Sequence, residues 1–178
     1  MAHMITHYPE DGPSLYIDFA KTGKDMPLSY TLMHSVRIAI KETLASEGVL
    51  ANCEVSFTLC DNEYIRELNK EHRGKDTATD VLSFPMLEAD EPLPKESETP
   101  VMLGDIVVSS ERAAEQAKSL DQSLGREILF LTVHSVLHLL GYDHERGEED
   151  EEEMCRKQRE IMARIDRLAG IKAEEENA

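Results

Sequence analysis

The sequence predicts an α+β fold in which a small mixed sheet of four strands is covered by helices, with one apolar helix at the centre. Segments with a two-residue hydrophobic period are mixed with helical segments, without the strict alternation of a doubly wound fold. The segment 123–140 is apolar on almost every side and therefore belongs inside the domain. The length of 178 residues suits one domain, residues 1–178.

Two strands and two helices are expected in the first half of the chain. The hydrophobic period changes between them as follows: strand 15–19, helix 29–47, strand 54–59 and helix 61–72. Ser29 and Asp61 have side chains typical of helix N-caps, and Gly48 can end the first helix.

The second half is expected to add two strands and three helices: strand 81–84, strand 106–109, helix 110–119, helix 123–140 and helix 148–168. The last helix has an inner apolar stripe of Met154, Ile161, Ile165 and Leu168. The proline-rich, acidic segment 86–101 is expected to be an exposed and mobile loop. The acidic segment 171–178 is expected to be a frayed tail.

The most informative motif is HSVLHLLGYDH, which places His134, His138 and His144 in an H-x3-H-x5-H array. On a helix, a spacing of four residues puts His134 and His138 on one face, one turn apart. Gly141 can end that helix and let the chain bring His144 back to the same ion. Three nitrogen ligands leave one coordination position open, as in catalytic zinc sites. The alternative is that the three are core or surface histidines whose spacing is a coincidence. Each ring that is buried would then need a polar partner.

The array has the ligand spacing and the glycine of the zinc-protease motif H-E-x-x-H-x-x-G-x-x-H, but Ser135 replaces the glutamate. That glutamate is the general base, and a serine hydroxyl does not replace a carboxylate near neutral pH. The sequence therefore disfavours a protease. Hydrolysis of another bond stays open, because a zinc-activated water is itself a nucleophile.

The same string resembles the signature of the YbeY family of metal-dependent endoribonucleases, H-G-x-L-H-L-x-G-Y-D-H, and departs from it only at Ser135. Two more blocks resemble that family, LNKEHRGKDTATDVLSFP at 68–85 and LGDIVVS at 103–109. The resemblance implies a single-strand-specific, zinc-dependent endoribonuclease. Its implied roles are maturation of the 3′ end of small-subunit (16S) ribosomal RNA and late-stage 70S ribosome quality control.

The resemblance also implies which residues carry the chemistry. His134, His138 and His144 would hold one Zn2+ per chain, or another divalent transition metal, in a cleft beside the sheet. Arg73 matches the family's arginine that is implicated in activity. Arg73 and His134 are our two candidate catalytic residues. A guanidinium can dock a phosphate or stabilise the charge that develops on it. The alternative for Arg73 is a solvated arginine that pairs with Asp76 or Asp80.

Three aspartates are candidates for a hydrogen bond to a ligand histidine, which would fix the tautomer of that ring. They are Asp80, Asp105 and Asp143. Each has the alternative of capping a turn. The general base is left open, because either a metal-activated water or the RNA 2′-hydroxyl can be the nucleophile.

The net charge of −17 opposes long-range attraction to RNA. Much of the negative charge lies in the runs 148–153 and 174–176, whereas Lys70, Arg73 and Lys75 form a local positive group for substrate binding. We therefore expect weak nonspecific affinity for RNA. The implied partners are ribosomal RNA, the small ribosomal subunit and ribosome-associated proteins, with no DNA and no membrane.

Two other classes of function fit the same residues. One is a ribosome-assembly binding factor whose metal stabilises the fold and whose nuclease activity is slight, and the other is a metal-dependent hydrolase of small molecules. The three cysteines lack metal-type spacing, and no apolar stretch is long enough to span a membrane. We also expect no secretory signal, because residues 1–12 have neither a basic region nor an apolar core. We therefore expect a cytoplasmic protein.

Overall fold

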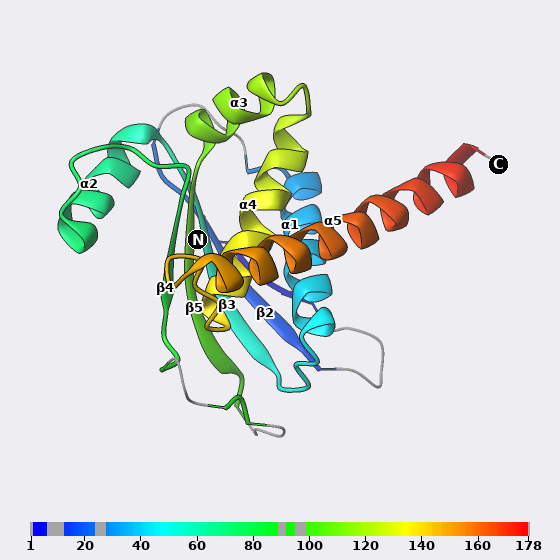
Figure 1. The fold of residues 1–178 in the computed structure, drawn as a ribbon. Coiled ribbons are helices and arrows are strands. Elements are labelled where there is room, and N and C mark those ends of the chain that lie inside the picture. Colours follow the sequence, from blue (N-terminus) through cyan, green and yellow to red (C-terminus); the bar gives the residue numbers. More distant parts are fainter. Residues whose placement is uncertain (1, 7–12, 24–27, 89–91, 95–98, 178) are drawn as a thin grey trace.

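The computed structural model describes residues 2–6, 13–23, 28–88, 92–94 and 99–177. In these residues the fold is α+β, as predicted, with helices packed on a mixed sheet of order β1-β2-β3-β5-β4 (Figure 1). The strands are β1 (Ala2–Thr6), β2 (Leu15–Lys21), β3 (Cys53–Cys60), β4 (Val81–Pro85) and β5 (Val101–Ser109). β3 is parallel to β2 and β5, whereas β1 and β4 are antiparallel edge strands.

All four predicted strands are present, and β1 adds a fifth at the edge beside β2. β5 begins at Val101, earlier than the predicted 106, because its first half contains an irregularity that hides the alternating pattern. The pairing of β3 with β5 shifts by one residue there, so that Glu54 pairs with Met102 but Val55 pairs with Gly104. Gly104 has φ +142°, and a Cβ at this position would collide with the Phe84 carbonyl oxygen.

The helices are α1 (Tyr30–Ser46), α2 (Asn62–Arg73), α3 (Ser110–Ser119), α4 (Leu124–Leu139) and α5 (Glu148–Asn177). The two predicted N-caps are confirmed, because Ser29 accepts a hydrogen bond from the Leu32 amide and Asp61 accepts one from the Tyr64 amide. α4 also starts with a cap, since the side chain of Ser123 accepts a hydrogen bond from the backbone of the first turn.

α1 and α4 cover one face of the sheet, and α5 crosses both on the outside (Figure 1). The predicted stripe of α5 is buried at Met154, Ile161 and Ile165, but the prediction for Leu168 was wrong, because this side chain is 40% exposed. α2 lies on the opposite face of the sheet, where Ile65 packs with residues of β4 and β5. α4 is thus enclosed between the sheet and α5, as its apolar composition predicts.

Two of the predicted segments, the last helix and the loop 86–101, include residues that the structure does not describe. α5 continues to Asn177, past the predicted end at 168, and the side chains of 170–178 lie outside the described residues. In the segment 86–101, residues 89–91 and 95–98 also lie outside them, so its mobility stays a prediction. None of the helices in the described ranges is long and apolar enough to cross a membrane.

Candidate metal centre

Two of the three histidines project from α4, the most enclosed helix of the fold. Most of its apolar side chains are buried against the sheet, against α1 and against α5. His134 and His138 lie on the remaining side, one helical turn apart, and both line a cleft. Packing on three sides therefore fixes the backbone that carries these two rings.

The third histidine follows a sharp reversal at the end of α4. Gly141 has φ 98°, and its amide donates to the His138 carbonyl at 3.0 Å. The Tyr142 amide donates to the Leu137 carbonyl at 3.1 Å, which completes a Schellman motif. The reversal directs His144 back along α4 toward the other two rings, as the position of the glycine predicts.

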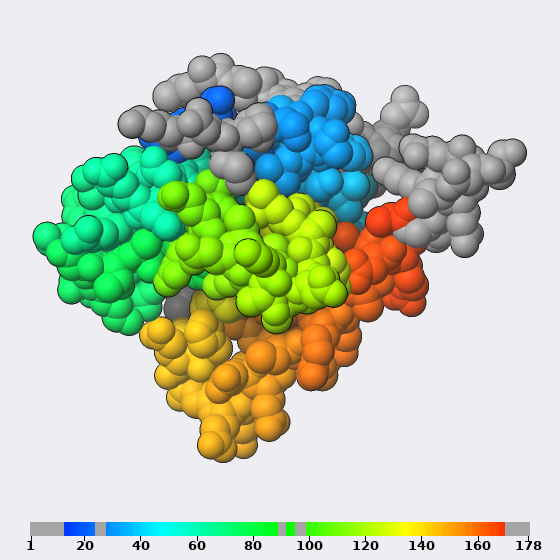
Figure 2. Space-filling view, turned by 90° about the horizontal axis from the view of Figure 1, so that it is seen from above, coloured from blue at the N-terminus to red at the C-terminus, as the bar shows by residue number. Residues whose placement is uncertain are grey.

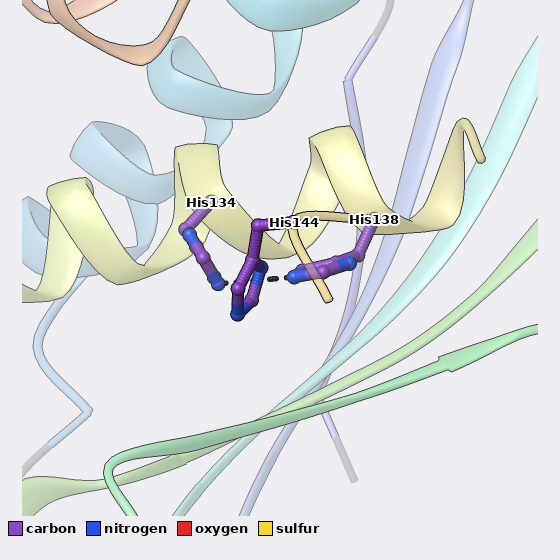
Figure 3. A group of neighbouring side chains, drawn as sticks. All are labelled: His134, His138 and His144. Atoms are coloured by element: carbon purple, nitrogen blue, oxygen red, sulfur yellow. Dashed lines mark hydrogen bonds between the residues drawn. The ribbon is translucent and has the colours of Figure 1, made fainter. Parts of the chain in front are cut away.

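Figure 3 shows the three imidazoles converging on a common point. One nitrogen of each ring lies within 4.8 Å of the others, and the Nε2 atoms of His134 and His138 are 3.1 Å apart. Zinc–nitrogen bonds of about 2.0–2.1 Å in a tetrahedral site put ligand nitrogens roughly 3.3 Å apart, so this pair has a suitable spacing. The structure therefore brings together the three residues that the sequence nominates as ligands.

The protonation of the cluster also suits a cation. Burial and the neighbouring His138 lower the pKa of His134 to about 4, and burial and His144 lower the pKa of His138. Both rings are therefore neutral near pH 7, and a neutral imidazole has the lone pair that a metal ligand needs. The Nδ1 atom of His144 is buried without a hydrogen-bond partner in the described part of the chain, so this ring has a nitrogen left for a group outside the chain.

The loop that carries His144 is tied to two distant helices. The Tyr142 hydroxyl donates to Glu47 Oε2 at 2.6 Å, and Lys157 Nζ lies 3.0 Å from Glu47 Oε1. The Lys157 ammonium also sits 5.2 Å from the centre of the Tyr142 ring. We call these three residues the Tyr142 clamp. The clamp holds the backbone two residues before His144 against the end of α1 and against α5.

The cluster opens into a cleft of about 500 Å³. In Figure 2 the surface is hollowed between the green residues of α2 and β4 and the yellow-orange residues that follow α4. The cleft is lined by Arg73 at the end of α2, by residues of β4 and by Phe130 and the three histidines. Phe130 is 37% exposed and lies one turn before His134 on a largely buried helix. The cleft thus combines an exposed aromatic ring, one guanidinium and the histidine cluster.

Arg73 lines the cleft, and its ion-pair partner is neither of the two aspartates that the sequence offered. Its Nη2 atom lies 3.3 Å from Glu145 Oε1, and neither Asp76 nor Asp80 pairs with it. Asp76 instead binds Arg66 and Lys70, so the Lys70 charge is already paired. Lys70 and Lys75 are both exposed and are not among the residues that line the cleft. Of the three predicted cations, Arg73 alone lines it.

None of the three aspartates hydrogen-bonds to a histidine in the described contacts. Asp80 accepts hydrogen bonds from the Val81 amide and from Gln116, and it lines the cleft without bonding a histidine. Asp143 accepts from the Glu145 amide, as an Asx turn requires. Asp105 lies within β5, opposite Phe84 on β4. Their proposed hydrogen bonds to the ligands are therefore not seen.

A residue that the sequence reasoning missed takes that position. Gln158 Oε1 lies 3.3 Å from His134 Nδ1, and Gln158 is only 5% exposed. The available signal was its place in α5: residues 154, 158, 161 and 165 form one helical stripe, and 158 is the polar member of that stripe. A polar residue on a buried stripe needs a partner, which here is the ligand histidine.

Comparison with known proteins adds a family to this geometry. The family model described as Endoribonuclease YbeY matches residues 18–166. The chain is 49% identical over 132 residues to a protein named Endoribonuclease YbeY from Caldanaerobacter subterraneus subsp. tengcongensis, covering 71% of this chain and 83% of that one. It is 44% identical over 151 residues to the protein of that name from Bacillus cereus strain B4264, covering 84% and 95%.

A solved structure has a similar fold. The solution structure of a protein from Thermotoga maritima matches with a TM-score of 0.59 and 26% sequence identity, covering 91% of this chain and 95% of that chain. The likeness extends over nearly the whole of both chains.

Proposed function

Because this chain belongs to the YbeY family of endoribonucleases, we propose that it is a zinc-dependent enzyme that cleaves single-stranded ribosomal RNA in the cytoplasm. The observation that carries the proposal is the three-histidine cluster at the base of a cleft that also presents Arg73. The finer roles that we propose are maturation of the 3′ end of 16S ribosomal RNA and late-stage quality control of 70S ribosomes. The proposed partners are the small ribosomal subunit and proteins associated with it.

Zinc suits the ligand set. Three imidazole nitrogens without a thiolate or a fourth protein ligand match the open sites in which zinc is catalytic. When bound, zinc polarises a phosphoryl oxygen and makes a coordinated water more acidic. The choice of zinc over other divalent transition metals rests on that coordination pattern, since imidazole also suits copper, nickel and iron.

The charges that line the cleft support a bound cation in the proposed function. Asp80, Asp143 and Glu145 contribute three carboxylates to the lining, against the single guanidinium of Arg73. A phosphodiester entering this cleft meets a local excess of negative charge unless a divalent ion offsets it. Arg73 is 39% exposed in its side chain, so it can exchange Glu145 for a phosphate without a large rearrangement. Its role in the proposal is to dock the phosphate and to stabilise charge that develops there.

Phe130 supports the preference for single strands. Its ring lies at the surface of the cleft, beside His134, where an unstacked base can lie against it. A base within a duplex has both of its faces covered by its neighbours. The ring can therefore contribute to affinity only where the strand is open, as it is at a ribosomal 3′ extension.

The deciding experiment compares cleavage of a single-stranded RNA that carries a ribosomal 3′ extension with cleavage of the same sequence in a duplex. The zinc-loaded protein should cut the single strand, and His138→Ala should lose both metal and cleavage. Arg73→Ala should slow cleavage about 100- to 1,000-fold, the range for removal of one transition-state donor. Arg66→Ala is the matched control, because Arg66 lies on the same helix but pairs with Asp76 outside the cleft.

The reaction products identify the nucleophile. A 2′,3′-cyclic phosphate end means that the RNA 2′-hydroxyl attacks, whereas linear ends with no cyclic intermediate mean that water attacks. Equal cleavage of single strand and duplex would remove the proposed specificity, and cleavage unaffected by His138→Ala would remove the proposed centre.

A second candidate is a ribosome-assembly binding factor with little nuclease activity. The net charge of −17 favours it, because this charge weakens encounters with free RNA. Zinc bound at one ion per chain, with tight binding to the small subunit and no cleavage of either RNA, would favour this function. For such a binding factor, removal of the metal should abolish binding to the small subunit.

A further inference from the structure

Gln158 on α5 connects the candidate metal centre to the backbone of α4. Its side-chain Nε2 donates to the Phe130 carbonyl oxygen at 3.2 Å, and its Oε1 lies 3.3 Å from His134 Nδ1. Gln158 is 5% exposed, so water does not compete for either end of the amide. Both ends of this buried amide are thus satisfied by α4.

The Phe130 contact decides which way round the amide lies. A backbone carbonyl only accepts hydrogen bonds, so the NH2 group of Gln158 must face Phe130. The reversed amide would place two acceptor oxygens against each other and lose that bond. The group that faces His134 is therefore the Gln158 carbonyl oxygen, which is also only an acceptor.

An acceptor opposite Nδ1 determines where the proton of His134 is. A neutral imidazole carries one proton, and only an Nδ1–H can donate to Gln158 Oε1. The lone pair is then on Nε2, the atom that lies 3.1 Å from His138 Nε2 in the cluster. We propose that Gln158 is a positioning residue that holds His134 in its Nδ1-protonated tautomer and so presents Nε2 to a divalent transition metal. The inference rests on the metal centre of the proposed function.

Two substitutions separate this role from a purely structural one. Gln158→Leu removes both hydrogen bonds. Gln158→Glu keeps an acceptor opposite Nδ1, while it loses the donor to Phe130 and adds a negative charge beside that carbonyl, so it disturbs the tie to α4 at least as much as the Leu variant. If Gln158 selects the tautomer, zinc affinity should fall about 10- to 100-fold in the Leu variant and stay within a few-fold of wild type in the Glu variant. Zn2+ affinity is measured by competition with a chromophoric chelator. If Gln158 only ties α5 to α4, the Glu variant should weaken zinc binding at least as much as the Leu variant, and this result would overturn the inference.

Thr132→Val is the matched control for loss of a buried hydrogen bond. The Thr132 hydroxyl donates to the Ile128 carbonyl at 2.7 Å within α4 and is not among the contacts of the histidines. This variant should bind zinc as the wild type does. A loss of affinity as large as that of Gln158→Leu would mean that general loosening of α4 explains the effect, and the inference would fall.

A second readout does not depend on the metal. Nitrogen-15 correlation spectra of metal-free protein near pH 7.5 should show His134 as the Nδ1–H tautomer in wild type and in Gln158→Glu. In Gln158→Leu they should show a larger share of the Nε2–H form. An unchanged tautomer in the Leu variant would contradict the inference even if zinc affinity falls. A wild type that binds no zinc would defeat the proposed function, while the spectra would still decide the role of Gln158.

Discussion

α4 and the loop that follows it supply ligands to the same cluster but are held in different ways. α4 is enclosed by the sheet, α1 and α5, and the backbone of His134 and His138 cannot shift without disturbing the core. The loop has half-buried and exposed residues, and its fixed points are the Schellman reversal at Gly141, the Tyr142 clamp and the exposed ion pair of Glu145 with Arg73. The comparison indicates that two ligands are preformed by packing, and that the third depends on a few polar contacts.

The largest expected effect comes from removing one ligand from each region. His144→Ala leaves two histidines one turn apart on a rigid helix, so weak zinc binding should survive. His138→Ala leaves one helical ligand and one loop ligand, whose separation is not fixed by packing, and bound zinc should fall from one ion per chain to none detectable. Elemental analysis and chelator competition measure both variants. Equal residual affinity would show that the loop is as well ordered as α4.

Chelation of the metal tests the same difference without a mutation. In metal-free protein the amides of Tyr142 and Arg146, which bond to Leu137 and Asp143, should exchange with solvent roughly tenfold faster or more. Amides in the middle of α4 should keep their protection, because their stability comes from the core. Hydrogen exchange with and without zinc measures this, and loss of protection across α4 would mean that the metal holds the core as well.

Tyr142→Phe should weaken the loop by removing one contact of the Tyr142 clamp. The hydroxyl donates to a carboxylate that is 11% exposed, and loss of such a charged hydrogen bond costs about 1.5–3 kcal/mol. Zinc affinity should fall about tenfold, because the backbone near His144 gains freedom. Urea unfolding and chelator competition give the two quantities.

Tyr64→Phe is the control for the clamp, since Tyr64 lies on α2, away from the loop. This variant should change neither the free energy of unfolding nor the zinc affinity by a comparable amount. If Tyr142→Phe lowers stability but leaves zinc affinity unchanged, the clamp supports the fold and not the ligand.

The smallest effect is expected within α4 itself. Thr132→Val removes a buried hydroxyl that bonds to the Ile128 carbonyl, which should lower the free energy of unfolding by about 1 kcal/mol. Zinc affinity should stay the same, because the packing of α4 against three neighbours maintains the two histidines. Urea unfolding and metal titration measure the two quantities. If the free energy of unfolding and the zinc affinity both fall, α4 and the loop form one cooperative unit.

Local signals explain how much of the fold could be predicted. The caps at Ser29 and Asp61 and the reversal at Gly141 depend on neighbours within a few residues, and all three were predicted correctly. The early start of β5 was missed, because the bulge before Gly104 interrupts the two-residue period. The exposed Leu168 was also missed, because helical periodicity continues after α5 has passed its neighbours.

The contacts around the histidines were less predictable, because they join distant segments. Arg73 pairs with Glu145, and His134 meets Gln158, although aspartates were the candidate partners of both in the sequence. A spacing motif identifies ligands that lie on one helix and its adjoining loop. The residues that orient those ligands come from whichever element packs against the ligand helix. Their distance from the ligands in the sequence is not fixed, so no motif identifies them.

α5 follows the three histidines in the sequence, and this order determines when the centre can be completed. The clamp joins Tyr142 and Lys157 to Glu47, across separations of 95 and 110 residues, and Gln158 is the next residue after Lys157. A chain is synthesised from its N-terminus, so α5 leaves the ribosome after α1 and α4. The histidines are therefore synthesised before the residues that orient them. The centre is therefore complete only after α5 has been made, so a chain that has grown only as far as His144 carries all three histidines without the clamp and without Gln158.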